Sequence, residues 1–248
     1  PIVYGFVAFF LLLIWLLGGK KGLCSIGGLA FTFFLILYFF LPFIYRGYSP
    51  VLGAVLTVVL TTIVTMFLIA GFTKKALIAM LGTITGVIAA GLLASLFGRL
   101  AQVTGYNVSD IENLIYVQEQ TGIRIGELLF SGILIAALGA VMDVSMSIAS
   151  SLQEVLEQNP SLNRKELFQS GMRIGKDMMG TMSNTLILAF TGGSINTLVF
   201  LYAYAYQYQQ IVNMYDIAIE IMQGIASSCG VILTVPVSSL LCAVIYKK

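Results

Sequence analysis

The sequence predicts an all-α integral membrane protein with seven transmembrane helices. Three observations support this fold class: the composition, the length of the apolar runs and the distribution of basic residues. Of the 248 residues, 58% are hydrophobic and only 10% are charged, and the mean hydropathy is +0.96. A soluble domain carries about 25% charged residues, so this chain lacks the polar surface of a water-soluble fold. We therefore expect the lipid bilayer to surround it.

A transmembrane helix needs about 20 mostly apolar residues, and we assign seven candidate spans on this basis. They cover residues 1–18, 23–44, 51–72, 76–97, 127–149, 178–206 and 217–246. Residues 1–248 are predicted to form a single transmembrane domain. Within it, residues 1–98 form four packing helices, residues 99–126 an outer loop and residues 127–248 three helices with polar stripes. The first run has neither a basic segment before it nor a cleavage site, so we expect a span and not a signal peptide.

The basic residues orient these spans. Most of them fall on one side of the membrane, namely Lys20, Lys21, Lys74, Lys75, Arg164, Lys165, Arg173, Lys176, Lys247 and Lys248. The opposite side receives only Arg46, Arg99 and Arg124. Because cytoplasmic loops carry the excess of Lys and Arg, the amino end is predicted outside and the carboxyl end in the cytoplasm. The outer loop then carries the carboxylates Asp110, Glu112 and Glu119.

The sequence contains no histidine, which excludes Ser-His-Asp and Cys-His catalysis, His-ligated zinc and a histidine proton relay. The net charge is only +2, so no nucleic-acid partner is expected. The three cysteines lie in apolar stretches and are interpreted as packing residues. A Cu(I) site is one interpretation of a methionine group, but gap filling is favoured; the group is Met142, Met146, Met178, Met179 and Met182. We expect no metal, no cofactor and no enzymatic activity.

The first four spans contain few polar residues, and their GxxxG pair Gly82–Gly86 predicts close helix packing. The fifth span is different, because small and polar residues recur on one face at steps of three and four. They are Gly132, Ala136, Gly139, Asp143, Ser147, Ser150 and Glu154. Asp143 lies inside the membrane, where an ionised carboxylate costs about 3 kcal/mol. It is the leading functional candidate, and the alternative is a structural Asp bonded to nearby hydroxyls.

Two further stripes follow. At the start of the sixth span, Lys176 is expected to reach the interface or to pair with Asp143 or Asp177; Thr181 and Asn184 continue this face. The seventh span carries Asp216, Glu220, Gln223, Ser227, Gly230 and Thr234 at similar steps. If the three polar faces pack together, a polar seam crosses most of the membrane. The candidate residues for proton relay or transport are Asp143, Ser147, Lys176, Asp177, Thr181, Asn184, Gln223 and Ser227.

Local signals predict where the helices of the carboxyl half begin, end and bend. Asn159 and Pro160 end the fifth helix, and Asn163 with Glu166 forms a capping box that starts a new one. Apolar and basic residues alternate after it, which predicts an amphipathic helix at about residues 162–176 on the inner membrane surface. Gly192 and Gly193 predict a break in the long sixth span. Pro236 predicts a kink in the seventh.

Several segments resemble the YibE/F-like family of bacterial multispanning proteins. They are LGAVMDVSMSIASS at residues 138–151, ELFQSGMRIGKDMMGTMSNTLILA at 166–189, GVILTVP at 230–236 and GKKG at 19–22. The resemblance covers nearly the whole chain. It implies a multi-pass protein of the bacterial cytoplasmic (inner) membrane, often paired with a larger paralogue that carries an extracellular domain.

A second resemblance concerns mechanism. An Asp in one span, an amphipathic helix and a Thr/Ser-rich start to the next span are similar to one membrane half of RND and SecD/SecF-type transporters. In those proteins two halves face each other and intramembrane carboxylates carry protons. This resemblance implies that Asp143 is the titrating group. The chain departs from the pattern because no large domain follows its first helix and one extra span is present.

Three functions are consistent with these features. The favoured hypothesis is a transporter or permease subunit, proton-coupled and working as a homodimer or with a paralogous partner on an unidentified small molecule or ion. The second is a membrane scaffold or assembly factor that uses the same glycine faces but tolerates loss of Asp143. The third, an intramembrane aspartyl protease using Asp143 and Asp177, is disfavoured because no Gly-x-Gly-Asp signature surrounds either residue.

Overall fold

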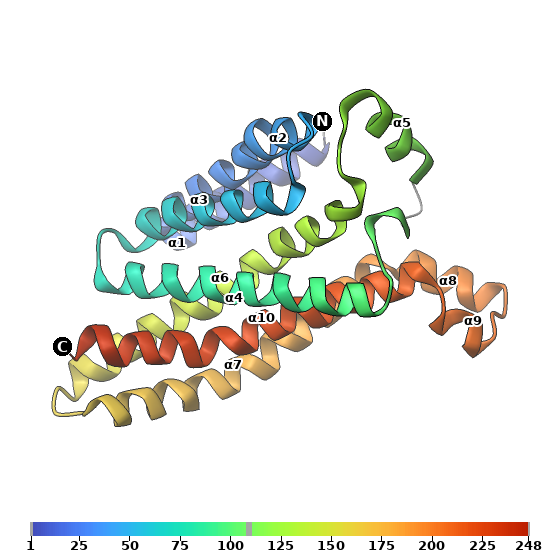
Figure 1. Cartoon of the computed structure of the whole chain (residues 1–248). Helices are drawn as coiled ribbons and strands as arrows, with labels where there is room; N and C mark the ends of the chain where they lie inside the picture. Colours follow the sequence, from blue (N-terminus) through green and yellow to red (C-terminus); the bar gives the residue numbers. More distant parts are fainter. Residues whose placement is uncertain (1, 108–110, 248) are drawn as a thin grey trace.

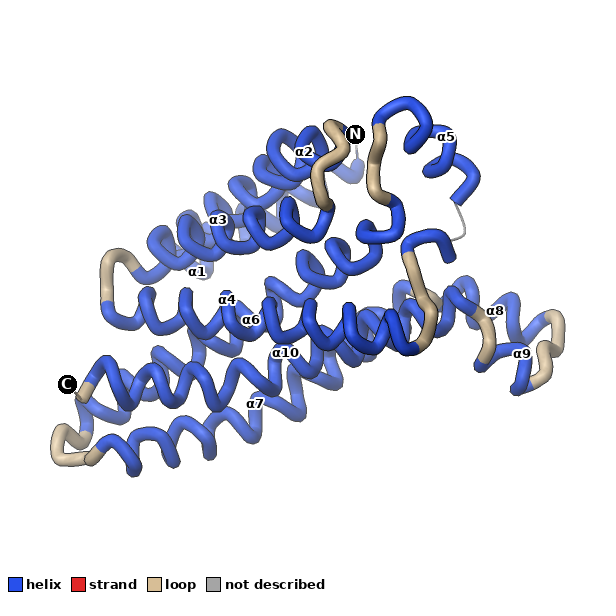
Figure 2. The backbone as a smooth tube through the Cα atoms, viewed as in Figure 1, coloured by secondary structure: helices blue, strands red, loops and turns tan. Residues whose placement is uncertain are grey.

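The computed structural model describes residues 2–107 and 111–247, and every regular element in these ranges is helical (Figures 1 and 2). The predicted all-α fold class is therefore confirmed. The longer helices are α1 (Ile2–Leu35), α3 (Pro50–Ala70), α4 (Lys74–Leu100), α6 (Ile125–Gln158), α7 (Arg164–Gly193) and α10 (Tyr215–Tyr246). The shorter elements are η1 (Ile36–Phe40), α2 (Leu41–Tyr45), η2 (Gly105–Asn107), α5 (Ile111–Thr121), α8 (Ile195–Ala203) and α9 (Tyr208–Val212). Asp110 of the predicted outer loop lies outside the described residues.

Five helices in the described ranges are long and apolar enough to cross a membrane, and a sixth span results if α7 and α8 are counted as one broken span. The multi-pass architecture is thus confirmed, but the count of seven is not. The difference arises at the amino end, where the first two predicted spans form one helical run, Ile2–Tyr45.

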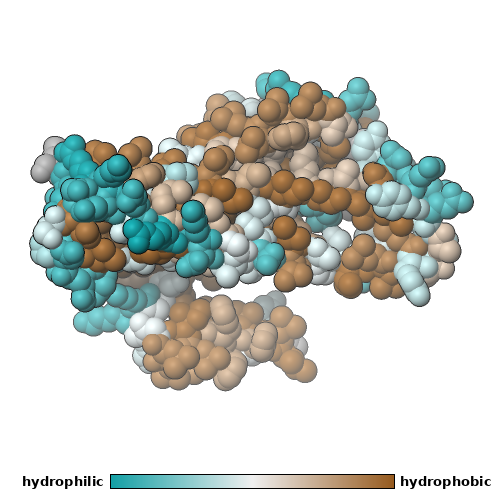
Figure 3. All heavy atoms as spheres, turned by 90° about the horizontal axis from the view of Figure 1, so that it is seen from below, coloured by the Kyte–Doolittle hydropathy of each residue, from teal (hydrophilic) through white to brown (hydrophobic). Residues whose placement is uncertain are grey.

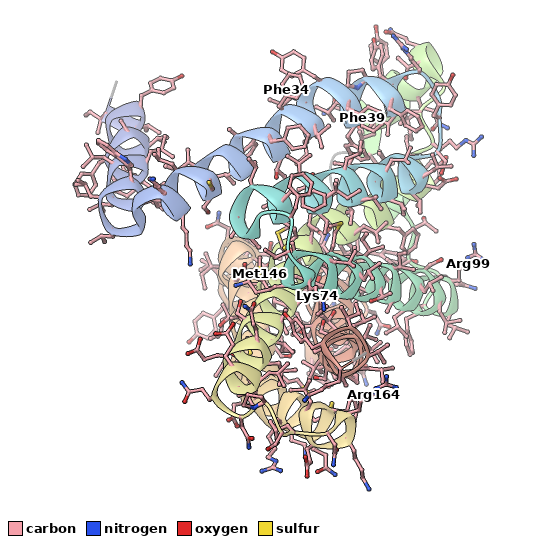
Figure 4. All side chains as sticks on the ribbon, turned by 90° about the vertical axis from the view of Figure 1, so that its left-hand side faces the viewer. Phe34, Phe39, Lys74, Arg99, Met146 and Arg164 are labelled. Carbon is pink, nitrogen blue, oxygen red and sulfur yellow. The ribbon has the colours of Figure 1, made fainter. Side chains whose placement is uncertain are left out.

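This first run bends sharply at Gly19. The backbone of Gly19 has φ 54° and ψ −133°, a conformation that only glycine adopts without strain. As a straight rod, 44 residues would extend about 66 Å, more than twice the hydrocarbon core of about 30 Å. The bend turns the first part of α1 away from the bundle (Figure 4). In the most hydrophobic 18-residue stretch of this run, no residue is buried.

The core lies between α4, α6, α7 and α10, with α10 packed against the other three helices. Its fully buried side chains are mostly aliphatic and include Ile78, Val87, Val141, Val144, Ile148, Leu152, Leu167, Val231 and Val235. On the other side of α6, α3 packs against α6 and α1. The predicted packing role of the GxxxG pair is confirmed, because Gly82 faces Ser145 and Ser238, and Gly86 faces Thr234.

The carboxyl half begins and breaks where the local signals predict. The capping box is formed: the side chain of Asn163 accepts from the backbone N–H of Glu166 at 2.9 Å, and the Glu166 carboxylate accepts from the N–H of Asn163 at 2.8 Å. The chain bends by 58° between α7 and α8, at the predicted glycine pair. α10 runs continuously through Pro236.

One boundary differs from the prediction. Residues 164–193 form a single helix, α7, so the amphipathic segment at 162–176 and the sixth span are not separate elements. Gly171 approaches Ser239 of α10 and Gly175 approaches Val235. These close contacts hold the first half of α7 along α10, and the helix therefore continues past Lys176 without a break. The outer face of this half is hydrophilic (Figure 3).

Charged residues gather at the two ends of the molecule. At one end, Arg164 Nε donates to the carbonyl of Lys247 at 2.7 Å, and Lys247 Nζ donates to the carbonyl of Pro160 at 2.5 Å. At the other end, Arg124 pairs with Glu127 at 3.5 Å. Figure 3 shows hydrophilic surface at both ends and an apolar middle. The predicted sidedness, with the carboxyl end in the cytoplasm, stays a prediction.

Candidate functional site

The small and polar face of α6 points outward from the bundle. Gly132 and Gly139 both have open space where a Cβ would stand, and Asp143 is exposed on the same face. Ser147 continues this face and is half-buried. The residues predicted to share one face therefore do so. At Gly132 and Gly139, no other described helix packs against this face.

Asp143 lies near the middle of α6. It is 18 residues from Ile125 and 15 residues from Gln158, or about 27 Å and 23 Å along the helix axis. Within the described residues its carboxylate makes no hydrogen bond and no ion pair. A carboxylate at this depth that faces lipid costs about 3 kcal/mol when ionised. Asp143 therefore needs a proton, water or a polar partner from outside this chain.

The stripe of α7 is exposed as well. Lys176, Asp177, Thr181 and Asn184 all lie on the outer surface of the helix. The Thr181 hydroxyl bonds within its own helix, 3.3 Å from the Asp177 carbonyl and 3.2 Å from the Met178 carbonyl. Neither ion pair considered for Lys176 is formed, since Arg124–Glu127 is the ion pair found in the described ranges. The other interpretation, in which Lys176 reaches the membrane interface, stays a prediction.

The stripe of α10 has a different environment, because its part from Ser227 to Thr234 is buried, with Gly230 and Thr234 against α4. Gly86 of α4 leaves room for the side chains of Thr234 and Val141, and Gly230 packs against Ala90. Ser227 is fully buried and its hydroxyl has no partner among the described residues, while Gln223 is half-buried. The three stripes thus do not form one seam within this chain. The glycines of α4 allow α10 to pack closely against it, whereas the polar faces of α6 and α7 remain exposed.

The methionine group fills space between helices. Its members are half-buried and pack against the core of α6, α7 and α10; they are Met142, Met146, Met178, Met179 and Met182. Met146 is labelled on α6 in Figure 4. Flexible side chains at such a junction fill irregular gaps, which accords with the interpretation favoured from the sequence.

A cavity of about 340 Å³ lies beside the break between α7 and α8. Its polar lining residues are Thr191, Ser194 and Glu220, and the rest of its wall is mainly aliphatic and aromatic. Thr191 of the predicted sixth span and the stripe residue Glu220 of the seventh thus line the same cavity. They lie apart from Asp143, because neither α6 nor Asp143 contributes to the lining.

Sequence reasoning missed one buried polar contact. Ser145 Oγ donates to the Ala79 carbonyl of α4 at 2.9 Å and lies 2.9 Å from Ser238 Oγ of α10. Both serines are completely buried. Neither serine belongs to a predicted stripe, so the only signal in the sequence was Gly82, which leaves space for both hydroxyls.

Comparisons with known proteins place the chain in a family. No curated protein and no solved structure gave a significant match. The family model described as "YibE/F-like protein" matches residues 6–248, which includes α6, α7 and the α10 segment that faces α4. Because this match extends over nearly the entire sequence, the chain belongs to the YibE/F-like family.

Proposed function

We propose that this protein is a subunit of a membrane transporter, and that the open face of α6 and α7 meets a second chain. The observation that carries the proposal is Asp143: a carboxylate near the middle of a membrane helix, exposed and without a described partner. Intramembrane carboxylates are rare because they are costly, and they commonly mark ion or proton paths.

The surroundings of Asp143 favour a protein partner over lipid. Asn184 on α7 adds an amide to the exposed surface, and a polar amide in hydrocarbon lacks hydrogen bonds. Gly132 and Gly139 leave open space on α6, which permits another helix to approach closely. A second copy of this chain, or a larger paralogue with the same polar face, covers the surface and supplies polar groups to Asp143.

Proton coupling follows from the chemistry available at this face. With no histidine in the chain, a carboxylate is the group that can bind and release a proton at membrane depth near physiological pH. Protonated Asp143 is neutral and tolerates an apolar environment, whereas ionised Asp143 requires water or a cation. A partner that alternately hydrates and shields Asp143 would therefore couple its own movement to proton transfer.

A membrane scaffold is the second candidate function. The open glycines at Gly132 and Gly139 favour it, because helix packing alone requires such a surface and no titratable group. The two functions differ in what they require. The scaffold requires the glycines, while the transporter requires Asp143 as well.

The test uses the complex that co-purifies with the wild-type chain in mild detergent, reconstituted into liposomes with an internal pH dye. Asp143→Asn keeps the size and hydrogen bonding of the side chain but cannot titrate. We expect it to abolish proton movement driven by an imposed pH gradient while the complex remains assembled. Glu154→Gln, on the same face near the end of α6, is the matched control and should retain movement.

Two results would contradict the proposal. Proton movement in Asp143→Asn equal to wild type would remove Asp143 as the carrier. An absence of proton movement in the wild-type complex, with assembly lost in Gly139→Leu, would favour the scaffold.

A further inference from the structure

A large cavity lies on the opposite side of α4 from α10. It has a volume of about 740 Å³ and is enclosed by α3, α4 and the start of α6. This volume falls within the range of about 300–1,000 Å³ for small-molecule sites. In Figure 1, α3 and α4 leave a common turn and separate toward their other ends, and α6 crosses behind α4. The lining residues of the cavity come from these three helices and the segment after α4, and Arg99 and Glu127 lie at one end of it.

The lining of the cavity changes along its length. Toward the middle of α4 it is aliphatic, with Val55 of α3, Ile88 of α4 and Leu134 of α6. Toward the carboxyl end of α4 it is polar, with Arg99, Gln102 and Glu127. From Ile88 to Arg99 the wall extends 11 residues along α4, or about 16 Å. This length is about half of the 30 Å hydrocarbon core, so it matches one leaflet.

The charges at the polar end of the cavity are not equivalent. The Glu127 carboxylate accepts from the Ser49 hydroxyl and pairs with Arg124. The Arg99 guanidinium, in contrast, has no hydrogen bond or ion pair with any residue in the described ranges. It projects away from the end of α4 (Figure 4). The available charge at the mouth is therefore positive, and its five donors suit a phosphate or carboxylate.

The cavity also has a wall that continues to the lipid-facing surface. Leu92 lines it and is 67% exposed, and Ile88, one turn away, is 40% exposed. A molecule already in the bilayer can therefore reach the cavity from the side of α4.

We propose that this cavity binds a phospholipid of the adjacent leaflet, with one acyl chain between α3, α4 and α6 and an anionic headgroup at Arg99. The aliphatic end accepts the acyl chain, the unpaired guanidinium of Arg99 binds the phosphate, and the lipid enters past the exposed side of α4. This inference does not depend on the proposed transport function, because no stripe residue of α6 or α7 lines the cavity.

Native mass spectrometry of the detergent-purified chain tests the proposal, with added phosphatidylglycerol as the probe. Wild type should retain one phosphatidylglycerol molecule after detergent exchange. Ser95→Phe places a ring in the cavity, because Ser95 lines it, and should reduce the retained lipid about tenfold. Leu96→Phe is the matched control on the next residue, which is 54% exposed and does not line the cavity; it should retain the lipid.

A second pair of variants tests the headgroup. Arg99→Gln should lower the preference for phosphatidylglycerol over phosphatidylcholine about tenfold, which corresponds to one charge-assisted contact. Arg46→Gln removes an exposed arginine that does not line the cavity and should leave the preference unchanged.

The outcomes are distinct. If Ser95→Phe fails to give a folded protein by circular dichroism, Val55→Phe is used instead, because it fills the cavity from α3. Retention in a folded cavity-filled variant equal to that of wild type would overturn the proposal. So would equal loss in Leu96→Phe and Ser95→Phe, because the lipid would then bind the outer surface of α4.

Discussion

The hydroxyl oxygens of Ser145 on α6 and Ser238 on α10 lie 2.9 Å apart at the centre of the bundle. Ser145 also donates to the Ala79 carbonyl of α4, at 2.9 Å. Since a serine has one hydroxyl proton, this donation makes Ser238 the donor in the Ser–Ser pair. One buried hydroxyl thus links three helices, and Gly82 of α4 provides the space for it.

The close approach of α4 and α10 also explains why part of the polar stripe of α10 is buried. One turn along α4, Gly86 faces Thr234, whose hydroxyl donates to the Gly230 carbonyl at 2.8 Å. This part of the polar face of α10 is therefore covered by α4, and the Thr234 hydroxyl finds its hydrogen-bond partner within α10. The face of α6 with Asp143 lies elsewhere on the helix and remains open.

A bulky residue at Gly86 should destabilise the isolated chain. In Gly86→Val the new side chain collides with Thr234 and Val141, and overpacking of this kind costs about 1–3 kcal/mol. Gly139→Val introduces the same side chain into a helix, with the same propensity cost, but into open space. Thermal unfolding of the monomer in detergent, followed by circular dichroism, should show a lower midpoint for Gly86→Val.

Gly139→Val should unfold close to wild type in that measurement and should weaken only the assembled complex. Equal loss of monomer stability in both variants would show that the α6 face is already packed within one chain.

The sequence predicts features that depend on neighbouring residues. The capping box at Asn163 and Glu166, the break at Gly192 and the close packing at Gly82 all follow from local spacing, and the structure contains each of them. Hydrophobic composition likewise predicts the membrane-spanning fold class. These signals require no knowledge of which helices are in contact.

Pairing between helices could not be predicted in the same way. Helical periodicity shows that Ser227, Gly230 and Thr234 share a face, but it does not show whether α6, α7 or α4 receives that face. The choice depends on Gly86 and Ala90, more than 130 positions earlier in the chain. The bend at Gly19 within one helix could not be predicted either, because the GKKG segment is typical of a loop between two spans. The structure turns there with one residue at positive φ.

Loss of the amide at Asn184 should weaken the proposed complex. Asn184→Leu removes a polar side chain from the exposed face of α7, and interhelical hydrogen bonds in membranes contribute about 0.6–2 kcal/mol. The dissociation constant of the co-purified complex should therefore rise about threefold to thirtyfold, as measured by dilution and single-molecule counting. Asn196→Leu, an exposed position on α8, is the control and should leave the constant unchanged. Tighter association of Asn184→Leu would contradict a polar interface.

A side chain at Gly19 should open the bend of α1. Alanine is strained at φ 54°, at a cost of about 1–3 kcal/mol, whereas Gly18→Ala adds the same methyl group where nothing lies within 4 Å. Spin labels at the exposed positions Leu12 and Leu29 report the bend, since a straight helix would place them about 26 Å apart. We expect Gly19→Ala, but not Gly18→Ala, to shift the distance distribution toward that value. Identical distributions would show that other contacts impose the bend.

The orientation of the chain in the membrane can be tested by labelling single cysteines, introduced into a variant in which Cys24, Cys229 and Cys242 are replaced by alanine. Glu119→Cys on α5 should react with an impermeant thiol reagent in intact cells, and Ser161→Cys between α6 and α7 should react only after permeabilisation. Both positions are exposed, so access is set by the membrane and not by burial. The physical basis is the excess of Lys and Arg at the end that contains Ser161. Labelling of Ser161→Cys in intact cells would reverse the assigned orientation.

A third cysteine, at Tyr4, tests whether the first leg of α1, the part before Gly19, crosses the bilayer. Tyr4 is 80% exposed. The leg before Gly19 contains 17 described residues, 2–18, or about 26 Å of helix, close to the 30 Å core. If it crosses, Tyr4→Cys lies on the same side as Glu119 and reacts in intact cells. This is the expected result, because Lys20 and Lys21 follow the bend and belong with the cytoplasmic lysines. Reaction of Tyr4→Cys only after permeabilisation would mean that the leg remains on the cytoplasmic side, and that the chain crosses the membrane fewer than seven times.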